Sequence, residues 1–463
     1  MMKSIIFVLL AVLIAQSSNL CAGESSDLDL AITIYNRNFA VIKEKLSIDF
    51  KEKLSEYVYK DAPSSIVPTS VKLYSLKNSG IVILDQNYIY DLVNKEKLMT
   101  KFIDKEIEIQ MERKFFRGIL LGSGTQDGAY TLKTEDGIVS IEPEKCDFIK
   151  FPDLPEGLIT TPSLKWKIKT DQTGINECGL LYETKNMGWS SEYVAVLKEN
   201  DSKLDLKGWV NISNNTSKSF KSAKLKLMAG DVGRVEDEVP RYSVKRNSLM
   251  SVAESAPAEE PEFIEKEFFE YHLYSLNVPA DLPSNSEKQI SLLEINDIPI
   301  VKNYVYDIRK DPKKICVFIE FENSKKNNAG VPLPAGKTRV NKIDSDDGSL
   351  EFIGEDKIEH VSENDKVSLL LGKAFDVKAD RIQKNYKRHS NTRWEESYEI
   401  TVSNSKSEDV SVKIRENVYG YKNWKILSNN YQYKKINSNQ IEFEVKVFSK
   451  EKKILNYTVE YFD

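Results

Sequence analysis

Apolar and polar residues alternate in short runs along most of this chain. The runs are rich in aromatic and β-branched residues, and Asn, Gly, Asp or Ser separates one run from the next. Alternation with a period of two is typical of strands with one buried face, and no long stretch shows a helical period with caps at both ends. Clear examples are AITIY, EIEIQ, YVAVLK, GWVNIS, KLKLMAG, CVFIEF, SYEITV, VSVKIRE and IEFEVKVF. Because 463 residues exceed what one core holds, the pattern predicts an all-β protein made of multiple antiparallel β-sandwich, Ig-like modules.

Proline- and glycine-containing stretches divide the chain into sections. We expect an N-terminal β domain over residues 28–98. Residues 99–152 follow with short strands and Gly-containing turns, which suit a small SH3-like β-barrel. The stretch FPDLPEGLITTPSL then leads to a β-sandwich region over residues 163–463. Within that region, residues 243–262 are small, acidic and proline-bearing without strand alternation, which predicts a flexible segment.

One local pattern recurs in the last section: an alternating strand, an Asn-containing polar turn and another strand. The matched residues are Asn214, Asn323 and Asn404. Their spacing is too irregular for a solenoid but natural for hairpins in stacked sandwiches. Asn favours such turns because its side chain bonds to the local backbone. We interpret the pattern as a scaffold signal without chemistry.

The first residues have the layout of a secretory signal peptide. One Lys, a long apolar run and small residues follow one another in MMKSIIFVLLAVLIAQSSNLCAG, which predicts a leader over residues 1–22 with cleavage after Ala22 or Gly23. An uncleaved anchor and lipidation at Cys21 are the alternatives, although the apolar run is shorter than the roughly 20 residues of a membrane span. No second stretch approaches that length, so we expect a secreted or periplasmic protein without a membrane span after cleavage.

The charge balance and the few metal-ligating residues narrow the function classes. With 66 Lys and Arg against 71 Asp and Glu, the chain is slightly acidic, so nucleic acid is not an expected partner. Three isolated histidines and the lack of a C-x-x-C pair exclude a zinc finger, and we expect no cofactor. Cleavage of the leader leaves Cys146, Cys178 and Cys316, among which at most one disulfide can form.

The stretch GVPLPAGKTRV, which begins at Gly330, invites comparison with a phosphate-binding loop. Its two glycines are separated by five residues instead of four, and Pro332 and Pro334 remove backbone donors that a phosphate cradle needs. The residues that follow alternate and contain Asp347-Gly348. They predict two strands joined by a tight turn where a phosphate loop would open a helix.

The carboxylates of FIGEDKIEH and LGKAFDV are the candidate catalytic groups. Glu355 and Asp356 lie near His360 in sequence, so a turn could present them as a general acid and base or as cation ligands. Adjacent residues on a strand point to opposite faces, however, which favours a solvated turn. Asp376 follows Phe375, and we expect a strand with Phe375 inward and Asp376 outward.

Two further stretches raise binding chemistry. DSDDGS places Asp344 and Asp346 close to a calcium-loop pattern, but its register is short by one residue and the bidentate Glu is misplaced, so a hairpin turn explains it better. Trp189, Tyr193 and Trp209 could form a sugar-stacking face. Their place within strand alternation favours core packing instead.

Several stretches together resemble a widespread bacterial family of unknown function whose C-terminal domain is shared with the mucoidy inhibitor A group. The resemblance covers nearly the whole chain after the leader and implies a secreted or envelope-associated β-rich protein, with no reaction to carry over. The chain departs from the mucoidy inhibitor group because it lacks a long charged helical segment between its halves. The stretches are IYNRNFAVIKE, VPTSVKLYS, LDQNYIYDLVNKEKLM, FPDLPEGLITTPSLKW, LLYETKNMGWSSEYVAVL, LDLKGWVNISNNTSKSFKSAKLKLMAGDVGRV, FFEYHLYSL, GVPLPAGKTRV, FIGEDKIEH and LLLGKAFDV.

These observations favour a non-enzymatic extracytoplasmic protein with an envelope-associated role that is structural or binds a glycan or protein partner. The alternative is a polysaccharide-acting hydrolase that uses Glu355, Asp356 and Asp376 as its acids. A third hypothesis is assembly through exposed strand edges, and the sequence leaves the oligomeric state open.

Overall fold

The computed structural model describes residues 30–77, 80–123, 128–198, 201–234, 263–418 and 423–463. The predicted leader and the predicted flexible segment at 243–262 lie outside these ranges. The described residues form 30 strands, one short α-helix and two 3-10 helices, which confirms the all-β prediction. No described helix has the length and apolar character needed to cross a membrane.

The first sheet combines strands from both ends of the first half of the chain. Its order is β16-β17-β15-β1-β2-β12-β4, with β18 paired to β15. Strand β1 pairs antiparallel with β2 and parallel with β15. It therefore lies between a strand of the predicted N-terminal domain and a strand of the predicted C-terminal region. The strands are β1 (Leu30–Tyr35), β2 (Phe39–Phe50), β4 (Ile66–Ser75), β12 (Gly174–Lys185), β15 (Phe220–Ala229), β16 (Phe263–Phe268), β17 (Tyr271–Leu276) and β18 (Ala280–Leu282). Strands β1, β2 and β4 of the predicted N-terminal domain therefore share one core with strands that follow residue 163.

A three-stranded sheet, β3-β11-β5, completes this first core. Its strands are β3 (Leu54–Lys60), β5 (Ile81–Ile89) and β11 (Ser163–Thr170). Because Ile89 pairs with Ser163, the whole segment between them is an insertion into a hairpin of this sheet.

The inserted segment folds as a small unit with a core of its own. It consists of α1 (Lys95–Lys101), β6 (Glu106–Met111), β7 (Lys114–Ser123), β8 (Tyr130–Thr134), β9 (Gly137–Ile141), the 3-10 helix η1 (Pro143–Lys145) and β10 (Phe148–Lys150). The sheet order is β10-β6-β7-β8-β9, and no described residues pair β10 with β9. The segment predicted as a small SH3-like barrel thus forms a five-stranded sheet, but its ladder is open and does not close into a barrel.

The second core lies under a sheet of order β19-β14-β13-β22-β23. Its strands are β13 (Met187–Leu197), β14 (Lys203–Asn214), β19 (Ser286–Pro299), β22 (Gly336–Ile343) and β23 (Leu350–Ile358). Strands β22 and β23 pair antiparallel across the turn at Asp347-Gly348, which confirms the prediction of two strands after the proline-rich loop. Strand β13 pairs parallel with β22.

A nine-stranded sheet folds around the third core, in the order β27-β30-β25-β24-β21-β20-β26-β29-β28. Its strands are β20 (Val301–Asp307), β21 (Lys314–Glu322), β24 (Lys366–Arg388), β25 (Trp394–Asn404), β26 (Val410–Asn417), β27 (Asn423–Asn429), β28 (Tyr433–Asn437), β29 (Gln440–Val447) and β30 (Lys452–Phe462); η2 (Lys325–Asn327) follows β21. Strands β20 and β26 are parallel, the third such pair in a structure that is otherwise antiparallel among its described strands.

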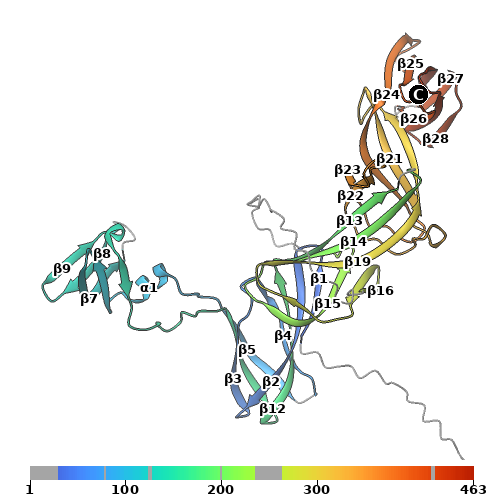
Figure 1. The fold of residues 1–463 in the computed structure, drawn as a ribbon. Coiled ribbons are helices and arrows are strands. Elements are labelled where there is room, and N and C mark those ends of the chain that lie inside the picture. The colour runs from blue at the N-terminus through green and yellow to red at the C-terminus, as the bar shows by residue number, and fades with distance from the viewer. Residues whose placement is uncertain (1–29, 78–79, 124–127, 199–200, 235–262, 419–422) are drawn as a thin grey trace, which may run out of the picture.

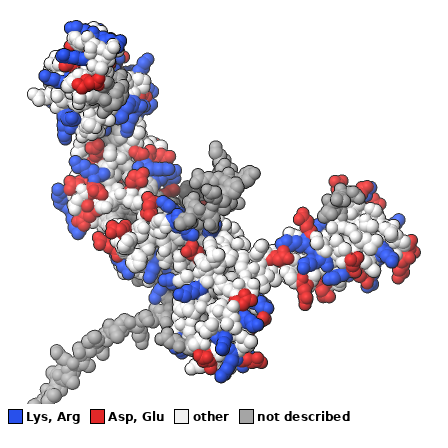
Figure 2. Space-filling model, turned by 180° about the vertical axis from the view of Figure 1, so that it is seen from behind, with Lys and Arg blue, Asp and Glu red and all other residues white. Residues whose placement is uncertain are grey.

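Long strands run from one core into the next. Strands β13, β14 and β19 contribute buried residues to the first and second cores, and β21 and β24 contribute to the second and third. Figure 1 shows the result, an elongated body that rises from β12 to the C-terminal strands while the small unit projects to one side. Lys, Arg, Asp and Glu are interspersed on the face of the body seen in Figure 2, so recognition on that face has to be local.

The three asparagines of the recurring turn are buried anchors for the backbone. Asn214, Asn323 and Asn404 are at most 2% exposed. Each side-chain amide donates to carbonyl groups of its own turn and of a second turn, and each Oδ1 accepts from a nearby backbone N–H. The acceptors are Lys218, Leu282 and Pro283 for Asn214, Val331 and Ser362 for Asn323, and Glu408, Val447 and Phe448 for Asn404. This confirms the interpretation of the pattern as scaffold.

A candidate ligand-binding cleft between the second and third cores

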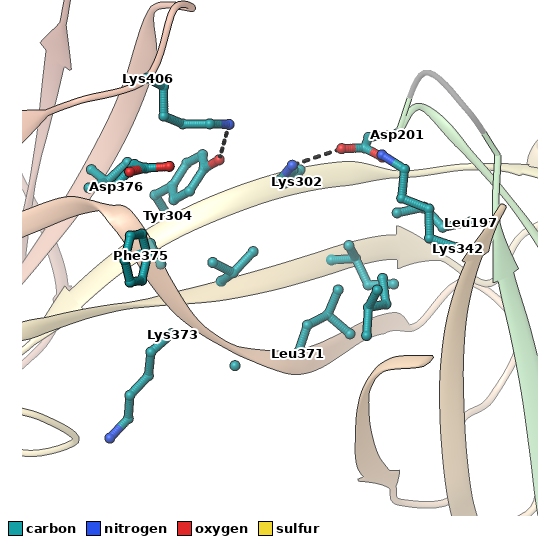
Figure 3. A pocket seen from close by; sticks show the side chains of 16 residues that line it. Leu197, Asp201, Lys302, Tyr304, Lys342, Leu371, Lys373, Phe375, Asp376 and Lys406 are labelled. Carbon is teal, nitrogen blue, oxygen red and sulfur yellow. Dashed lines mark hydrogen bonds and ion pairs between the residues drawn. The ribbon is translucent and has the colours of Figure 1, made fainter. Parts of the chain in front are cut away.

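A cavity of about 300 Å³ lies where the second and third cores meet (Figure 3). Strands β13, β20, β21, β22, β23 and β24 line it, together with the turns that follow β13 and β25. We call it the cleft. Its apolar floor consists of Val317, Ile319, Ile353 and Leu371, and its polar rim of Asp201, Lys302, Lys342, Lys373, Asp376 and Lys406.

The cleft exists because β24 changes its partner. The strand pairs with β21 from Lys366 to Lys373, and the ladder is then interrupted until Lys378. From Val377 onward it pairs with β25, and beyond Lys378 it has no further partner in β21. The residues between these two ladders form a wall of the cleft, and the backbone carbonyl of Asp376 is held by the Ser405 N–H at 2.7 Å. The change of partner is also what carries the chain from the second core into the third.

Gly354 explains how β23 reaches this wall. A Cβ at Gly354 would lie 2.4 Å from the carbonyl oxygen of Leu371, which is closer than packed atoms approach. The adjacent carboxylate of Asp356 accepts a hydrogen bond from the Leu370 N–H at 2.8 Å, where the β21–β24 register shifts. The glycine and the carboxylate of FIGEDK therefore dock β23 onto the irregular part of β24.

Two aromatic rings flank one end of the cleft (Figure 3). Phe375 is 86% exposed, so the sequence prediction that it points inward is wrong. The alternation that supported that prediction assumes an unbroken ladder, and β24 has left β21 at this position. Tyr304 is buried in the wall between Phe375 and Lys406, and its hydroxyl accepts a hydrogen bond from Lys406 Nζ at 3.1 Å.

Ion pairs hold the charged rim in place. Asp201 accepts from Lys302 at 2.7 Å and from Lys342 at 2.5 Å at the other end of the cleft (Figure 3). Burial alone would raise the pKa of Asp201, but the hydrogen bonds from the two lysines outweigh it, and the pKa is lowered. Lys373 binds Asp311 outside the cleft at 2.6 Å, and Asp376 has no ion pair with another described residue. The cleft thus offers fixed donors at both ends and a carboxylate beside Phe375.

The other candidate acids lie elsewhere and serve the scaffold. Glu355 faces Lys337 and Arg339 at 3.9 Å on the neighbouring strand. His360 accepts from the Ala335 N–H through Nδ1 at 3.2 Å, and burial lowers its pKa. Neither of them lines the cleft, nor does Asp356. Of the predicted site residues, only Asp376 lies in the cleft.

The remaining predicted binding residues also have local structural partners. Asp344 accepts from the Asp346 N–H at 2.8 Å in the β22–β23 turn. Trp189 and Tyr193 are buried, and their side chains donate to the carbonyls of Met228 and Pro334. The proline-rich loop is therefore a packed connection: the Tyr193 and Tyr274 hydroxyls bond to its Pro334 and Pro332 carbonyls.

A family model for a domain of unknown function, DUF4139, matches residues 179–461. The chain belongs to the DUF4139 family. The match includes the cleft and all three asparagine anchors. It begins within β12, whose partners β2 and β4 lie outside the match, so the DUF4139 region and the N-terminal strands form one sheet. A search of curated proteins found no match.

Sequence reasoning missed most of the cleft. Asp201, the β20 residues Lys302 and Tyr304, and Lys406 come from three distant parts of the DUF4139 region, and no motif connects them. One sequence feature did indicate the position of the cleft. Gly372 lies inside β24, a strand of unusual length, and an isolated glycine within a strand marks an irregularity in strand pairing.

Proposed function

We propose that this DUF4139 protein is a non-enzymatic extracytoplasmic binding protein whose cleft takes up an oligosaccharide of the cell envelope. The observation that carries the proposal is the combination of an 86% exposed Phe375 with a rim of immobilised charges around a cavity of about 300 Å³. That volume lies at the lower end of the range of small-ligand sites. The position between two modules is also where such sites commonly occur.

A sugar ring fits the distribution of groups in the cleft. Its apolar face can lie against an aromatic ring, as it could on Phe375, while its hydroxyl groups exchange hydrogen bonds with fixed polar side chains. Asp376 accepts, and Lys302 and Lys406 donate. Because Asp201 and Tyr304 already hold these two amines, little side-chain entropy is lost when a ligand binds them.

The carboxylates of the cleft suit binding better than hydrolysis. A glycosidase needs a general acid with a raised pKa opposite a second carboxylate. The pKa of Asp201 is lowered because the hydrogen bonds from two lysines outweigh the effect of burial. A carboxylate of this kind has no proton to donate as a general acid. Glu355 and Asp356, the other acids of the hydrolase hypothesis, lie outside the cleft.

The test is a glycan array followed by calorimetry on the best ligand, with Phe375→Ala as the test variant. Phe269→Ala is a matched control, because Phe269 is 84% exposed in the β16–β17 turn and does not line the cleft. We expect at least a tenfold loss of affinity for Phe375→Ala, about 1.4 kcal/mol, and an unchanged affinity for Phe269→Ala. Equal affinities of both variants would refute the cleft as the site.

The cellular setting is part of the proposal. The leader-like first 22 residues support export, and the resemblance to the mucoidy inhibitor A group supports an envelope role. Mass spectrometry of the protein recovered from its native host tests the first point. A mature N-terminus at Gly23 or Glu24 supports export, whereas an intact Met1 in the cytosolic fraction contradicts it.

A further inference from the structure

The end of the third module carries a cluster of metal-ligating side chains that is separate from the cleft. His389, Glu395 and Glu460 place one ligand atom each within 4.8 Å of one another, and no other group of three such residues occurs among the described residues. His389 lies in the β24–β25 hairpin, which reaches the far end of the elongated body in Figure 1. Glu395 and Glu460 come from β25 and β30.

The strand register forces the two carboxylates together. Glu395 and Glu460 are directly opposite each other in the antiparallel β25–β30 pair, so their side chains lie on the same face of the sheet. Like charges directly opposite each other in such a pair are destabilising, so the pair favours positive charge nearby. The Glu460 side chain is only 9% exposed, so its charge needs a partner, and in the absence of a metal ion Arg393 supplies it.

We propose that His389, Glu395 and Glu460 form a binding site for a divalent transition metal ion, for which zinc is the probe. An imidazole nitrogen with two carboxylate oxygens is a ligand set that zinc accepts, and a water molecule completes the tetrahedron. His389 Nε2 and Glu395 Oε1 are 2.6 Å apart. Ligand atoms around zinc are roughly 3.3 Å apart, so side-chain movements of about 1 Å open the pair for the ion.

Positively charged groups around the site limit its affinity for a metal ion. Arg393 binds Glu460 Oε1 at 2.5 Å, and the guanidinium has to release this oxygen or share the carboxylate with the metal. Lys387 is opposite Glu395 on the flanking strand β24, Lys425 is opposite Glu460 on β27, and both lysines are exposed. We therefore expect a dissociation constant on the order of micromolar, weaker than that of a structural zinc site.

The first experiment titrates the purified, metal-free chain with ZnCl₂ by calorimetry and repeats the titration with CaCl₂. We expect one zinc ion per chain and no calcium binding at this site, because calcium prefers all-oxygen ligands. His389→Ala should weaken zinc binding at least tenfold. His272→Ala is the matched control: His272 Nδ1 lies 2.7 Å from Glu265, but no third ligand joins this pair among the described residues.

A second variant that should bind zinc more tightly separates the loss of a metal ligand from misfolding. Arg393 is 58% exposed, and Arg393→Gln removes the group that competes for Glu460 without removing a metal ligand. We expect zinc to bind severalfold more tightly to this variant, which unfolding cannot cause. The proposal is overturned if wild type and His389→Ala bind zinc equally, if His272→Ala loses as much affinity as His389→Ala, or if Arg393→Gln binds more weakly than wild type.

Discussion

Replacing Asn404 by Ala tests whether the asparagine anchors hold each module together. The side chain is 2% exposed, and its amide donates to the carbonyls of Glu408, Val447 and Phe448 at 2.8, 3.3 and 3.1 Å. Its Oδ1 accepts from the Lys406 N–H at 2.9 Å. A net contribution of about 1 kcal/mol per buried hydrogen bond gives a destabilisation of about 3 to 4 kcal/mol.

Hydrogen exchange measured by mass spectrometry is the suitable assay, because a protein with several cores need not unfold in one step. Peptides from β25 and β29 should lose about 100-fold or more in protection, since about 1.4 kcal/mol corresponds to a factor of ten. Peptides from the small unit, which has its own core, should not change.

Asn429→Ala is the matched control for this substitution. The Asn429 side chain is exposed and donates only to the local Tyr431 carbonyl, so we expect less than about 0.5 kcal/mol of destabilisation. If Asn404→Ala lowers protection of β25 less than fivefold, or no more than Asn429→Ala does, the asparagines do not anchor the turns.

Three further predictions follow from single features. Gly354→Ala should lower the melting temperature by several degrees and distort the cleft, because the new Cβ meets a β24 carbonyl at 2.4 Å. Gly122→Ala is the control, and it should leave the melting temperature in a thermal scan unchanged because no atom lies closer than 3.8 Å to the new Cβ. Burial raises the pKa of Cys178 to about 11. Iodoacetamide at pH 8 should therefore alkylate the partly exposed Cys146 before Cys178, and mass spectrometry that finds Cys178 modified first contradicts this. The hydrogen bond from its lysine partner, assisted by backbone N–H groups, lowers the pKa of Asp311 to about 2. A lowered pKa gives stability above the unfolded value near 3.8 that is lost as the pH falls to about 2, so replacing Asp311 by Asn should reduce stability at pH 6 more than at pH 2 in urea titrations.

The sequence predicted the elements of this fold better than their partners. Period-two alternation identified strands such as β13, β14 and β26 because each has one buried face, and the recurring Asn turn correctly marked the ends of β14 and β25. It did not reveal that β1 pairs with β15, or that β24 serves two cores, because pairing over such distances depends on the whole arrangement of sheets.

The same limit applies to the candidate site. Asp376 was recognised as a candidate acid from its local stretch, but Phe375 was assigned to the wrong side because alternation fails where β24 leaves β21. Asp201 and Lys302 gave no local signal, since charged residues near turns usually belong to a solvated face. Such sites form where regular pairing breaks down, and local patterns describe regular pairing.

The pairing of Ile89 with Ser163 has a consequence for how the chain is organised. Opposite residues of antiparallel strands lie only about 5 Å apart, so a turn of two to four amino acids would be enough to connect β5 to β11. The body does not need the 73 residues that intervene between them to close its hairpin. Substitutions of the side chains that the small unit exposes to solvent can therefore accumulate without disturbing the fold of the rest of the molecule.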